Sequence, residues 1–436
     1  MPTGNNRENS IRIAIEERGK AIISTQKSRE DYRQYFTPPE IAALAASLFS
    51  STSASLPLID LGAGTGILGV YTALSVQTSS VTAVESDISL VEGCRRSLAT
   101  LGLEYSVVCN DALDVSFDRD FGRAVLNPPY QKAVTDLTDD DGVTVRTPNL
   151  YAAFIVKAIS LLSSKGELVA IVPRSWMSGA YYAPFRHYIL SRCSLDSIIV
   201  LDSRTDAFSE FGVLQEICIV KLTKDGCQHL VSVAENHRIG DKPAFQPVEL
   251  KQLLLGDDLV IATANVGGKQ KATLAEAGFR ASTGKIVMHR NGASATASKG
   301  RGAQVPLIQV ENLSNGGVLH PAENPKKPQW LDANCARNGL IPAGYYVLVK
   351  RFSPKEEKKR LRGFLLAAKE PVAVENHINI LHAGTTRSVV PLKRAQAERL
   401  LQWVNSSETE SYFNSFASTT QVNAGDLNRL PLERGI

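Results

Sequence analysis

Short hydrophobic runs alternate with helical patterns between residues 56 and 221. The runs are rich in β-branched residues, and they predict strands at Leu56–Leu61, Val81–Glu85, Tyr105–Cys109, Ala124–Leu126, Leu168–Val172, Ser197–Leu201 and Ile217–Lys221. Apolar residues spaced three or four apart predict helices at Pro38–Phe49, Ile67–Val76, Ile88–Leu101, Leu150–Leu162 and Tyr181–Ser191. Thr37 is the expected N-cap of the first helix, which has proline in its first turn. This alternation predicts an α/β domain, a mostly parallel sheet with helices on both faces.

The pattern changes after about residue 225, and we place a domain boundary between residues 225 and 245. Strands are expected at Gln304–Val310 and Gly344–Lys350, separated by turns that contain Gly, Asn and Pro. Residues 291–303 contain few apolar side chains and predict a surface loop. A helix is expected near Arg394–Trp403. The second half therefore predicts a mixed, partly β domain.

Composition indicates a globular protein without a membrane span. Hydrophobic residues make up 43% of the chain and charged residues 21%, which is typical of soluble domains. No apolar stretch reaches the length of a spanning helix, and residues 1–10 do not resemble a signal peptide. The six cysteines are scattered, so neither a zinc site nor a disulfide framework is expected. We therefore expect a cytoplasmic protein with no membrane partner.

Charge is distributed unevenly along the chain. Residues 1–230 contain 21 Lys and Arg against 26 Asp and Glu, whereas residues 231–436 contain 27 against 18. A basic half can bind a polyanion and leave the other half for chemistry. Many domains are mildly basic for solubility alone, so charge by itself leaves nucleic acid binding open.

A glycine-rich turn follows the first predicted strand. The run Asp60-Leu61-Gly62-Ala63-Gly64-Thr65-Gly66 places glycines where the backbone must approach a ligand closely. This pattern alone could equally hold a dinucleotide. The carboxylate of Asp60, however, favours a cationic amine over a pyrophosphate.

Acidic residues end the first three predicted strands. Glu85 ends the second strand, and Asp111 follows the third. Ligands of α/β folds bind at the carboxyl ends of the strands, so Glu85 could hold ribose hydroxyls and Asp111 an adenine amino group. Each acid alone could be a solvated strand end or a helix cap. Three of them in register, counting Asp60, favour a nucleoside-containing cofactor.

The tetrapeptide Asn127-Pro128-Pro129-Tyr130 follows the fourth predicted strand. An amino group on an aromatic base is a poor nucleophile because its lone pair is delocalised into the ring. Two acceptors on its N–H bonds, the Asn127 side-chain oxygen and the Pro128 carbonyl, could stabilise the charge that develops during attack. Pro129 stiffens the loop, and Tyr130 offers a face for stacking. The motif predicts in-line displacement at a sulfonium methyl, without a metal. An ordinary Pro-Pro turn is the alternative interpretation.

With these motifs, and with Gln34-Tyr35-Phe36-Thr37-Pro38, the sequence resembles the adenine-N6-specific DNA methyltransferases of restriction–modification systems. The resemblance implies a Rossmann-like class I methyltransferase domain, with a seven-stranded, mostly parallel sheet and a reversed hairpin at one edge. It implies S-adenosyl-L-methionine as the cofactor. Tyr35, Phe36 and Thr37 would flank its methionine part. Glu85 would hold its ribose, and Asp111-Ala112 its adenine.

A narrower resemblance covers the second half of the chain. Val213–Glu216, Ser282–Lys285, Val347–Ser353, Glu375–Asn379 and Thr420–Ala424 are similar to segments of BsuBI/PstI-like methyltransferases. The resemblance implies an N-terminal helical extension at 1–29, a catalytic domain at 30–235 and a target-recognition domain at 236–436. Where that pattern has Gly-Pro, this sequence has Gly284-Lys285, so base contacts there are expected to differ.

A DNA duplex hides the amino group of adenine, so the enzyme is expected to flip its target base out. Tyr130 would stack on one face, and Phe208 or Phe211 would contact the other side, although either Phe could equally be a core residue. The basic segment Lys350–Arg362 could bind phosphates or form a solvated helix. The expected DNA contacts are Lys285, Arg290, Lys350, Arg351, Lys358 and Lys359. For His377 we expect a structural or DNA-contact role, since methyl transfer needs neither a metal nor a histidine base.

The same tetrapeptide also serves methyltransferases that act on cytosine N4, on RNA adenine or on protein glutamine. We expect the glutamine enzymes to lack the long basic second half, and the cytosine motif begins more often with Ser or Asp. A non-catalytic DNA specificity subunit would predict decay of the tetrapeptide or the glycine turn, and both are intact. We therefore expect a monomeric modification enzyme acting on double-stranded DNA, with a separately encoded restriction endonuclease as its potential partner.

Overall fold

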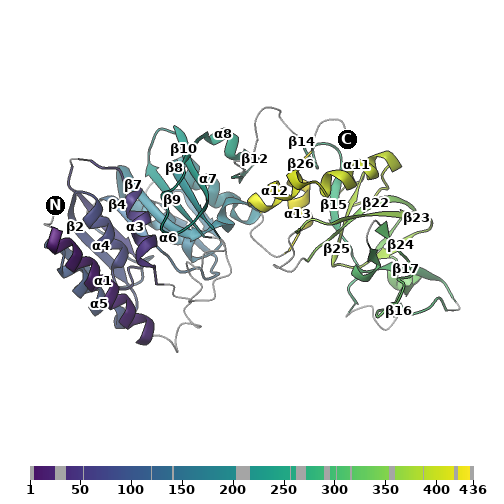
Figure 1. The fold of residues 1–436 in the computed structure, drawn as a ribbon, viewed down its shortest axis with the longest axis horizontal. Helices are drawn as coiled ribbons and strands as arrows, with labels where there is room; N and C mark the ends of the chain where they lie inside the picture. The colour runs from purple at the N-terminus through teal and green to yellow at the C-terminus, as the bar shows by residue number, and fades with distance from the viewer. Residues whose placement is uncertain are drawn as a thin grey trace. The chain divides into compact units, whose positions relative to one another are not determined.

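The computed structural model describes residues 4–24, 36–52, 54–118, 120–139, 142–202, 217–255, 257–261, 272–288, 295–300, 302–314, 317–352, 359–385, 387–416 and 421–432. The chain forms two compact units, Met1–Ile261 (unit 1) and Ala262–Ile436 (unit 2). Figure 1 draws the helices and strands of both units, and each unit is described by itself. None of the helices in these described ranges is long and apolar enough to cross a membrane.

Unit 1 contains a nine-stranded sheet with the order β11-β10-β8-β9-β7-β4-β1-β2-β3. Its strands are β1 Leu56–Leu61, β2 Thr78–Glu85, β3 Glu104–Cys109, β4 Phe121–Leu126, β7 Leu162–Pro173, β8 Cys193–Leu201, β9 Ile217–Lys224, β10 Leu230–His237 and β11 Gln246–Glu249. β9 is antiparallel to both β7 and β8. The seven neighbouring strands β8-β9-β7-β4-β1-β2-β3 confirm the expected class I arrangement, in which one strand near the edge of the sheet is reversed. The sheet is larger than expected, because β10 and β11 extend it.

These two additional strands also move the domain boundary. β10 pairs parallel with β8, and β11 pairs antiparallel with β10. The chain therefore stays with the first sheet beyond the expected boundary at residue 235, and the units divide after Ile261. The polar turns near residues 225–245 connect strands of one sheet rather than two domains.

The helices of unit 1 are α1 Gly4–Ser24, α3 Pro39–Ser47, α4 Ile67–Ser75, α5 Ile88–Ala99, α6 Leu150–Leu161, α7 Ala183–Arg192 and α8 Leu250–Leu253, with 3-10 turns η1 Arg174–Met177 and η2 Ala180–Tyr182. α1 packs against α4 and α5, α3 packs against α4, and α6 packs against β7. From β1 the chain proceeds to β2 on one side, and from β4 it proceeds to β7 on the other. Right-handed crossovers therefore place α4 and α6 on opposite faces of the sheet. Because the strand order changes direction between β1 and β4, a crevice opens between the carboxyl ends of these two strands.

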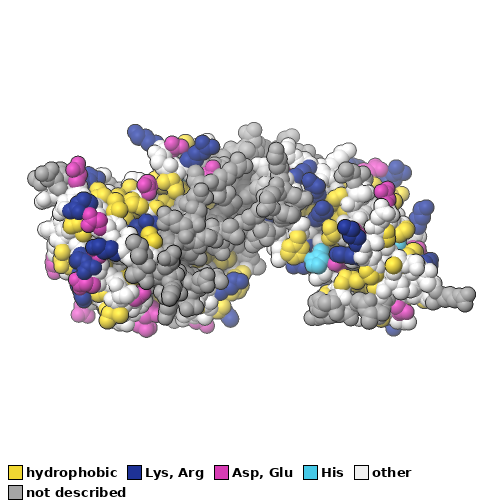
Figure 2. All heavy atoms as spheres, turned by 60° about the horizontal axis from the view of Figure 1, so that its bottom comes forward, with side chains coloured by type: hydrophobic (Ala, Val, Ile, Leu, Met, Phe, Trp, Pro, Cys, Tyr) yellow, Lys and Arg dark blue, Asp and Glu magenta, His cyan; other side chains and the backbone are white. Residues whose placement is uncertain are grey.

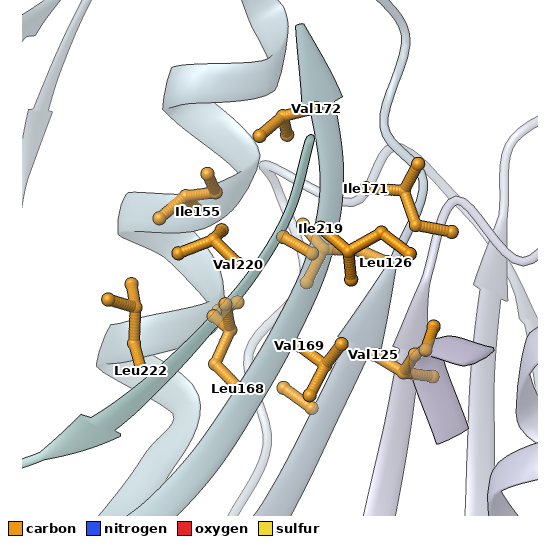
Figure 3. Packing of buried hydrophobic residues seen from close by; sticks show 14 of the residues in the cluster. Val125, Leu126, Ile155, Leu168, Val169, Ile171, Val172, Ile219, Val220 and Leu222 are labelled. Carbon is orange, nitrogen blue, oxygen red and sulfur yellow. The ribbon is translucent and has the colours of Figure 1, made fainter. Parts of the chain in front are cut away.

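β7 shows how the centre of the sheet is packed on both faces. Leu168 and Val172 lie on the side of α6 with Ile155, whereas Val169 and Ile171 point to the other face (Figure 3). All of these side chains are almost completely buried. Central strands covered on both faces are apolar at nearly every position, and each such side chain stabilises the fold by about 1.5–3 kcal/mol. The packed side chains on both faces therefore fix the positions of the carboxyl ends of the central strands.

Thr37 is not the N-cap of the first predicted helix. The cap of α3 is Pro38, which makes no side-chain capping bond. The Thr37 hydroxyl accepts a hydrogen bond from the Asn127 side-chain nitrogen, 3.0 Å away. A tertiary partner thus replaces the local capping bond that the sequence predicted.

Unit 2 is rich in strands, as expected. A four-stranded antiparallel sheet has the order β15-β25-β22-β23, and a five-stranded mixed sheet has the order β16-β20-β17-β24-β21. Their strands are β15 Arg280–Thr283, β16 Ala295–Thr296, β17 Gln304–Ile308, β20 Trp330–Asp332, β21 Leu340–Ile341, β22 Gly344–Lys350, β23 Gly363–Ala368, β24 Val372–Val374 and β25 Ile378–His382. The helices are α10 Ala333–Ala336, α11 Arg394–Val404, α12 Ser407–Phe416 and α13 Ala424–Arg429, with the 3-10 turn η5 Val310–Asn312.

Short strand pairs complete the described structure. They are β5 Thr135–Thr138 with β6 Thr144–Thr147, β12 Leu254–Leu255 with β13 Asp258–Leu259, β14 Ala272–Thr273 with β26 Pro431–Leu432, and β18 Leu313–Ser314 with β19 Gly317–Val318. The β5–β6 hairpin follows the tetrapeptide, so it lies close in sequence to the carboxyl end of β4.

Candidate active site

The glycine turn folds back onto the end of β2. The backbone N–H groups of Gly62 and Ala63 donate to the Val84 carbonyl at 2.9 and 3.0 Å. Gly62 and Gly64 have φ values of +70° and +56°, a left-handed conformation that glycine adopts without steric cost. The sequence Gly-x-Gly is therefore required by this backbone path, which leaves the turn's main chain facing the crevice.

Glu85 holds this turn in place. Its two carboxylate oxygens accept hydrogen bonds from the backbone N–H of Gly64, at 2.7 Å, and of Asp87, at 2.8 Å. Glu85 is only 6% exposed, and burial raises the pKa of its carboxyl above the ordinary value. Each oxygen carries two lone pairs, so the carboxylate can also accept from a ligand in the crevice.

Asp60 lies deeper, beneath the turn. It is completely buried, and its Oδ2 accepts a hydrogen bond of 2.9 Å from the Gly69 N–H in the first turn of α4. Burial raises the pKa of Asp60 to about 7. The carboxyl therefore fastens α4 to β1, and its expected contact with a cofactor amine stays a prediction.

Asn110 and Asp111 follow β3 at the same edge of the sheet. The Asn110 side-chain oxygen accepts from the Asp111 N–H, and Asp111 Oδ1 accepts from the Leu113 N–H, each at 2.9 Å. Both residues are exposed. Their side chains can therefore hydrogen-bond a ligand without a change in the backbone.

A cavity of about 210 Å³ joins these elements to the tetrapeptide. Its lining consists of Phe36, Gly62, Gly64, Val84, Glu85, Ser86, Leu90, Asn110, Asp111, Ala112, Asn127, Pro128, Pro129, Gln131, Leu150 and Phe154. The structure thus brings the two motifs together, as the sequence predicted. Parallel pairing of β1 with both β2 and β4 explains this, because their carboxyl ends meet at one edge.

The Asn127 amide is held by two hydroxyl groups. Its nitrogen donates to Thr37 Oγ1, and its oxygen accepts from the Tyr130 hydroxyl, both at 3.0 Å. Tyr130 is buried, and its ring meets the Tyr151 ring edge-on at 6.3 Å. In this conformation Tyr130 orients Asn127, and the expected stacking of a base on its ring stays a prediction.

Some expected site residues lie away from the cavity lining. Thr37 and Tyr130 hydrogen-bond to Asn127, which lines the cavity. Asp60 and Gly66 are not among the lining residues. Tyr35, Phe208 and Phe211 lie outside the described residues. The lining residues that sequence reasoning missed include Leu90, Gln131 and Phe154. Only Gln131, next to the tetrapeptide, carried a signal, because Leu90 and Phe154 look like ordinary apolar positions of amphipathic helices.

The expected DNA contacts in unit 2 differ in their surroundings. Lys285 is exposed, and Lys350 is partly buried at the end of β22. Arg351 lies over the Phe352 ring at 5.8 Å and donates to the Asn376 carbonyl at 3.2 Å. Lys359 donates to the Asn405 carbonyl within the unit. Arg290 and Lys358 lie outside the described residues.

Comparison with known proteins provides independent evidence of relationship. The family model "Eco57I restriction-modification methylase" matches residues 107–208. The type II methyltransferase M.PstI of Providencia stuartii is 31% identical over 97% of this chain and 91% of its own length. The type II methyltransferase M.BsuBI of Bacillus subtilis is 29% identical over 93% and 88%. The crystal structure of the type IIG restriction endonuclease BpuSI aligns with a TM-score of 0.47 and 13% identity, over 95% of this chain and 60% of that chain.

The two methyltransferases match both units, so the relationship includes the basic second half as well as the sheet that carries the cavity. This match confirms the sequence-based expectation of a methyltransferase that uses S-adenosyl-L-methionine. The chain belongs to the family of type II restriction–modification methyltransferases that includes M.PstI and M.BsuBI.

Proposed function

We propose that this protein transfers a methyl group from S-adenosyl-L-methionine to the N6 amino group of a flipped-out adenine in double-stranded DNA. It would act as the site-specific modification enzyme of a type II restriction–modification system. One observation carries this proposal: Asn127 and Pro128 line the same cavity as Gly64, Glu85 and Asp111. A methyl acceptor held by the first two residues would therefore meet a cofactor held by the other three.

The residues of the cavity fit the cofactor. Glu85 and Asp111 provide acceptors for ribose hydroxyls and an adenine amino group, while Val84, Leu90 and Phe154 provide apolar walls for a purine ring. Two carboxylates also suit a ligand that carries a cationic sulfonium. When bound, the cofactor supplies an electrophilic methyl group.

Asn127 would activate the adenine amino group. Its side-chain oxygen has a second lone pair beside the one that receives the Tyr130 hydrogen bond, so it can accept from the amino N–H. The Pro128 carbonyl would accept from the other N–H, and neither proline carries an N–H that competes. These fixed dipoles would stabilise positive charge on the nitrogen as the methyl bond forms.

Unit 2 would bind the DNA. Residues 262–436 contain 24 Lys and Arg against 13 Asp and Glu, whereas unit 1 has an excess of acids. A cationic unit gains affinity for DNA by releasing counterions from the phosphates. We propose Lys285, Lys350 and Arg351 as phosphate or base contacts. A restriction endonuclease encoded separately would cleave the unmethylated site.

The test is a methylation assay with purified protein, labelled cofactor and unmodified plasmid DNA, followed by mass analysis of the nucleosides. N6-methyladenine is the expected product, and Asn127→Ala is the inactive control. N4-methylcytosine would contradict the assignment of the base. Label found in added RNA or protein, with none in DNA, would contradict the substrate class.

A further inference from the structure

Four segments that are distant in sequence meet at one end of the sheet β15-β25-β22-β23. Thr283 pairs with Asn379, and Lys350 pairs with Ile378, in the antiparallel registers of β15, β25 and β22. The Asn379 side chain accepts from Thr283 Oγ1 at 3.0 Å and donates to the Val422 carbonyl at 2.6 Å. The turn between β24 and β25, residues 375–377, therefore lies beside the ends of two other strands and the segment around Val422.

The backbone of this turn is held from both sides. Arg351 donates from its N–H to the His377 carbonyl at 2.9 Å and from its guanidinium to the Asn376 carbonyl at 3.2 Å. The Asn376 N–H donates to the Ile286 carbonyl at 2.9 Å. Gly284 approaches so closely that an added Cβ would lie 2.2 Å from the Glu375 carbonyl oxygen. The turn is thus a rigid support for the side chains at its tip.

The tip carries two polar side chains, the partly buried Asn376 and the exposed His377, and the group beneath them is a buried acid. The His377 side chain is 46% exposed, and its Nδ1 donates to Glu375 Oε1 at 2.9 Å. Glu375 is only 2% exposed, and its Oε2 finds no partner among the described residues. Burying a carboxylate costs free energy unless hydrogen bonds or an opposite charge offset the loss of water. Here its hydrogen bond to Nδ1 fixes the orientation of the imidazole, so Nε2 is the ring nitrogen left for a ligand.

Aromatic and basic groups surround the tip. Phe352 is 44% exposed, and its ring lies 5.3 Å from the His377 ring. Arg351 and the exposed Lys285 flank it. On the face drawn in Figure 2, basic side chains lie beside hydrophobic ones and a histidine in unit 2. A turn with polar side chains and neighbouring cations suits a groove of duplex DNA, because phosphates lie on both sides of the base edges there.

We propose that the β24–β25 turn is a base-reading element that enters the major groove of double-stranded DNA, with Asn376 and His377 contacting base edges. An asparagine amide matches the N6 and N7 atoms of adenine in a bidentate arrangement. Asn376 is therefore assigned to an A·T pair of the recognition sequence, and His377, held by Glu375, to a neighbouring pair. This inference rests on the proposed DNA substrate and adds which residues choose the site.

The test compares the wild type with Asn376→Ala, His377→Ala and Lys369→Ala. Lys369 is an exposed cation that follows β23 at the opposite end of the same sheet, about 20 Å away along the strands, so it is a matched control. Each protein is expressed in cells with otherwise unmethylated DNA, and methylated bases are mapped by sequencing. Melting temperature and cofactor affinity of the purified proteins report folding, with Asn376→Ser as a milder second variant.

In Asn376→Ala, methylation at wild-type sites is expected to slow about 5- to 150-fold, the loss of one bidentate base contact. New sites should differ from the wild-type sequence at one A·T pair. His377→Ala should relax one neighbouring position, and Lys369→Ala should change neither sites nor rate. Unchanged sites and rates in both turn variants overturn the inference. Equal slowing at every sequence, with no new sites, also overturns it, because that result assigns the turn to phosphate contacts.

Methylation of DNA by the wild-type protein distinguishes a failure of this inference from a failure of the proposed function. A wild-type protein that leaves DNA unmethylated contradicts the proposed function before any variant is compared. A wild-type protein that methylates a defined site, together with turn variants that methylate the same sites at the same rate, contradicts only the role of the turn.

Discussion

Thr37 offers the sharpest test of how the Asn127 amide is positioned for its proposed catalytic role. Its hydroxyl is buried and accepts a hydrogen bond from Asn127 Nδ2 at 3.0 Å. Thr37→Val keeps the size of the side chain and removes that acceptor. A neutral hydrogen bond contributes about 0.5–1.5 kcal/mol, so kcat should fall about 2- to 13-fold if the bond orients the amide in the transition state.

The assay is single-turnover methylation of plasmid DNA, together with the cofactor Kd and the melting temperature. Thr37→Ser keeps the hydroxyl and is the matched control, with kcat close to wild type. If Thr37 instead contacts the methionine part of the cofactor, as the family resemblance implies, Thr37→Val should raise the cofactor Kd and leave kcat unchanged. Equal kcat values for the valine and serine variants would refute the positioning role.

Four further variants test the remaining elements. Asn127→Ala should keep the cofactor Kd and lower kcat at least 100-fold, as expected for a lost transition-state contact; wild-type turnover would remove its catalytic role. Glu85→Ala should raise the cofactor Kd about 10- to 100-fold in a calorimetric titration, because the Gly64 turn loses a charged acceptor; an unchanged Kd contradicts this. Lys285→Ala should weaken DNA binding for all sequences alike and reduce the salt dependence by about one counterion, whereas an unaltered salt slope would exclude a phosphate contact. Burial raises the pKa of Asp60 to about 7, so folding disfavours its ionised form. The contribution of Asp60 to the free energy of unfolding is therefore complete below about pH 4 and is lost as the pH rises to 7. In urea unfolding of the cofactor-free protein, Asp60→Asn should remove this decline, and parallel stability–pH curves for variant and wild type would contradict it.

The boundary between the two units shows a limit of local pattern reading. Turn-forming residues between positions 225 and 245 predict the end of the first domain, yet β10 lies in this region, β11 follows directly after it, and both strands join the first sheet. An edge strand carries the same short hydrophobic pattern whether it joins one sheet or another. Its partner is chosen by tertiary packing, here the parallel pairing of β10 with β8.

The candidate site was predictable where it depends on motifs at strand ends. The glycine turn, Glu85 and Asn127 could be placed together because parallel strands align their carboxyl ends at one edge. The roles of Thr37 and Tyr130 could not be foreseen, because both depend on hydrogen bonds to Asn127. Thr37 and Asn127 are 90 positions apart, and nothing in the spacing of the two residues indicates that they meet.

The amino-acid sequence alone therefore determined the α/β class and the positions of the glycine turn, Glu85 and the tetrapeptide at strand ends. These follow from hydrophobic periodicity and from residue types whose backbone or side-chain chemistry is local. Only the tertiary structure decided that Asp60 fastens α4, and that the turn of Glu375 and His377 lies beside Arg351 and Phe352. Such contacts join segments whose separation along the chain carries no information about their distance in space.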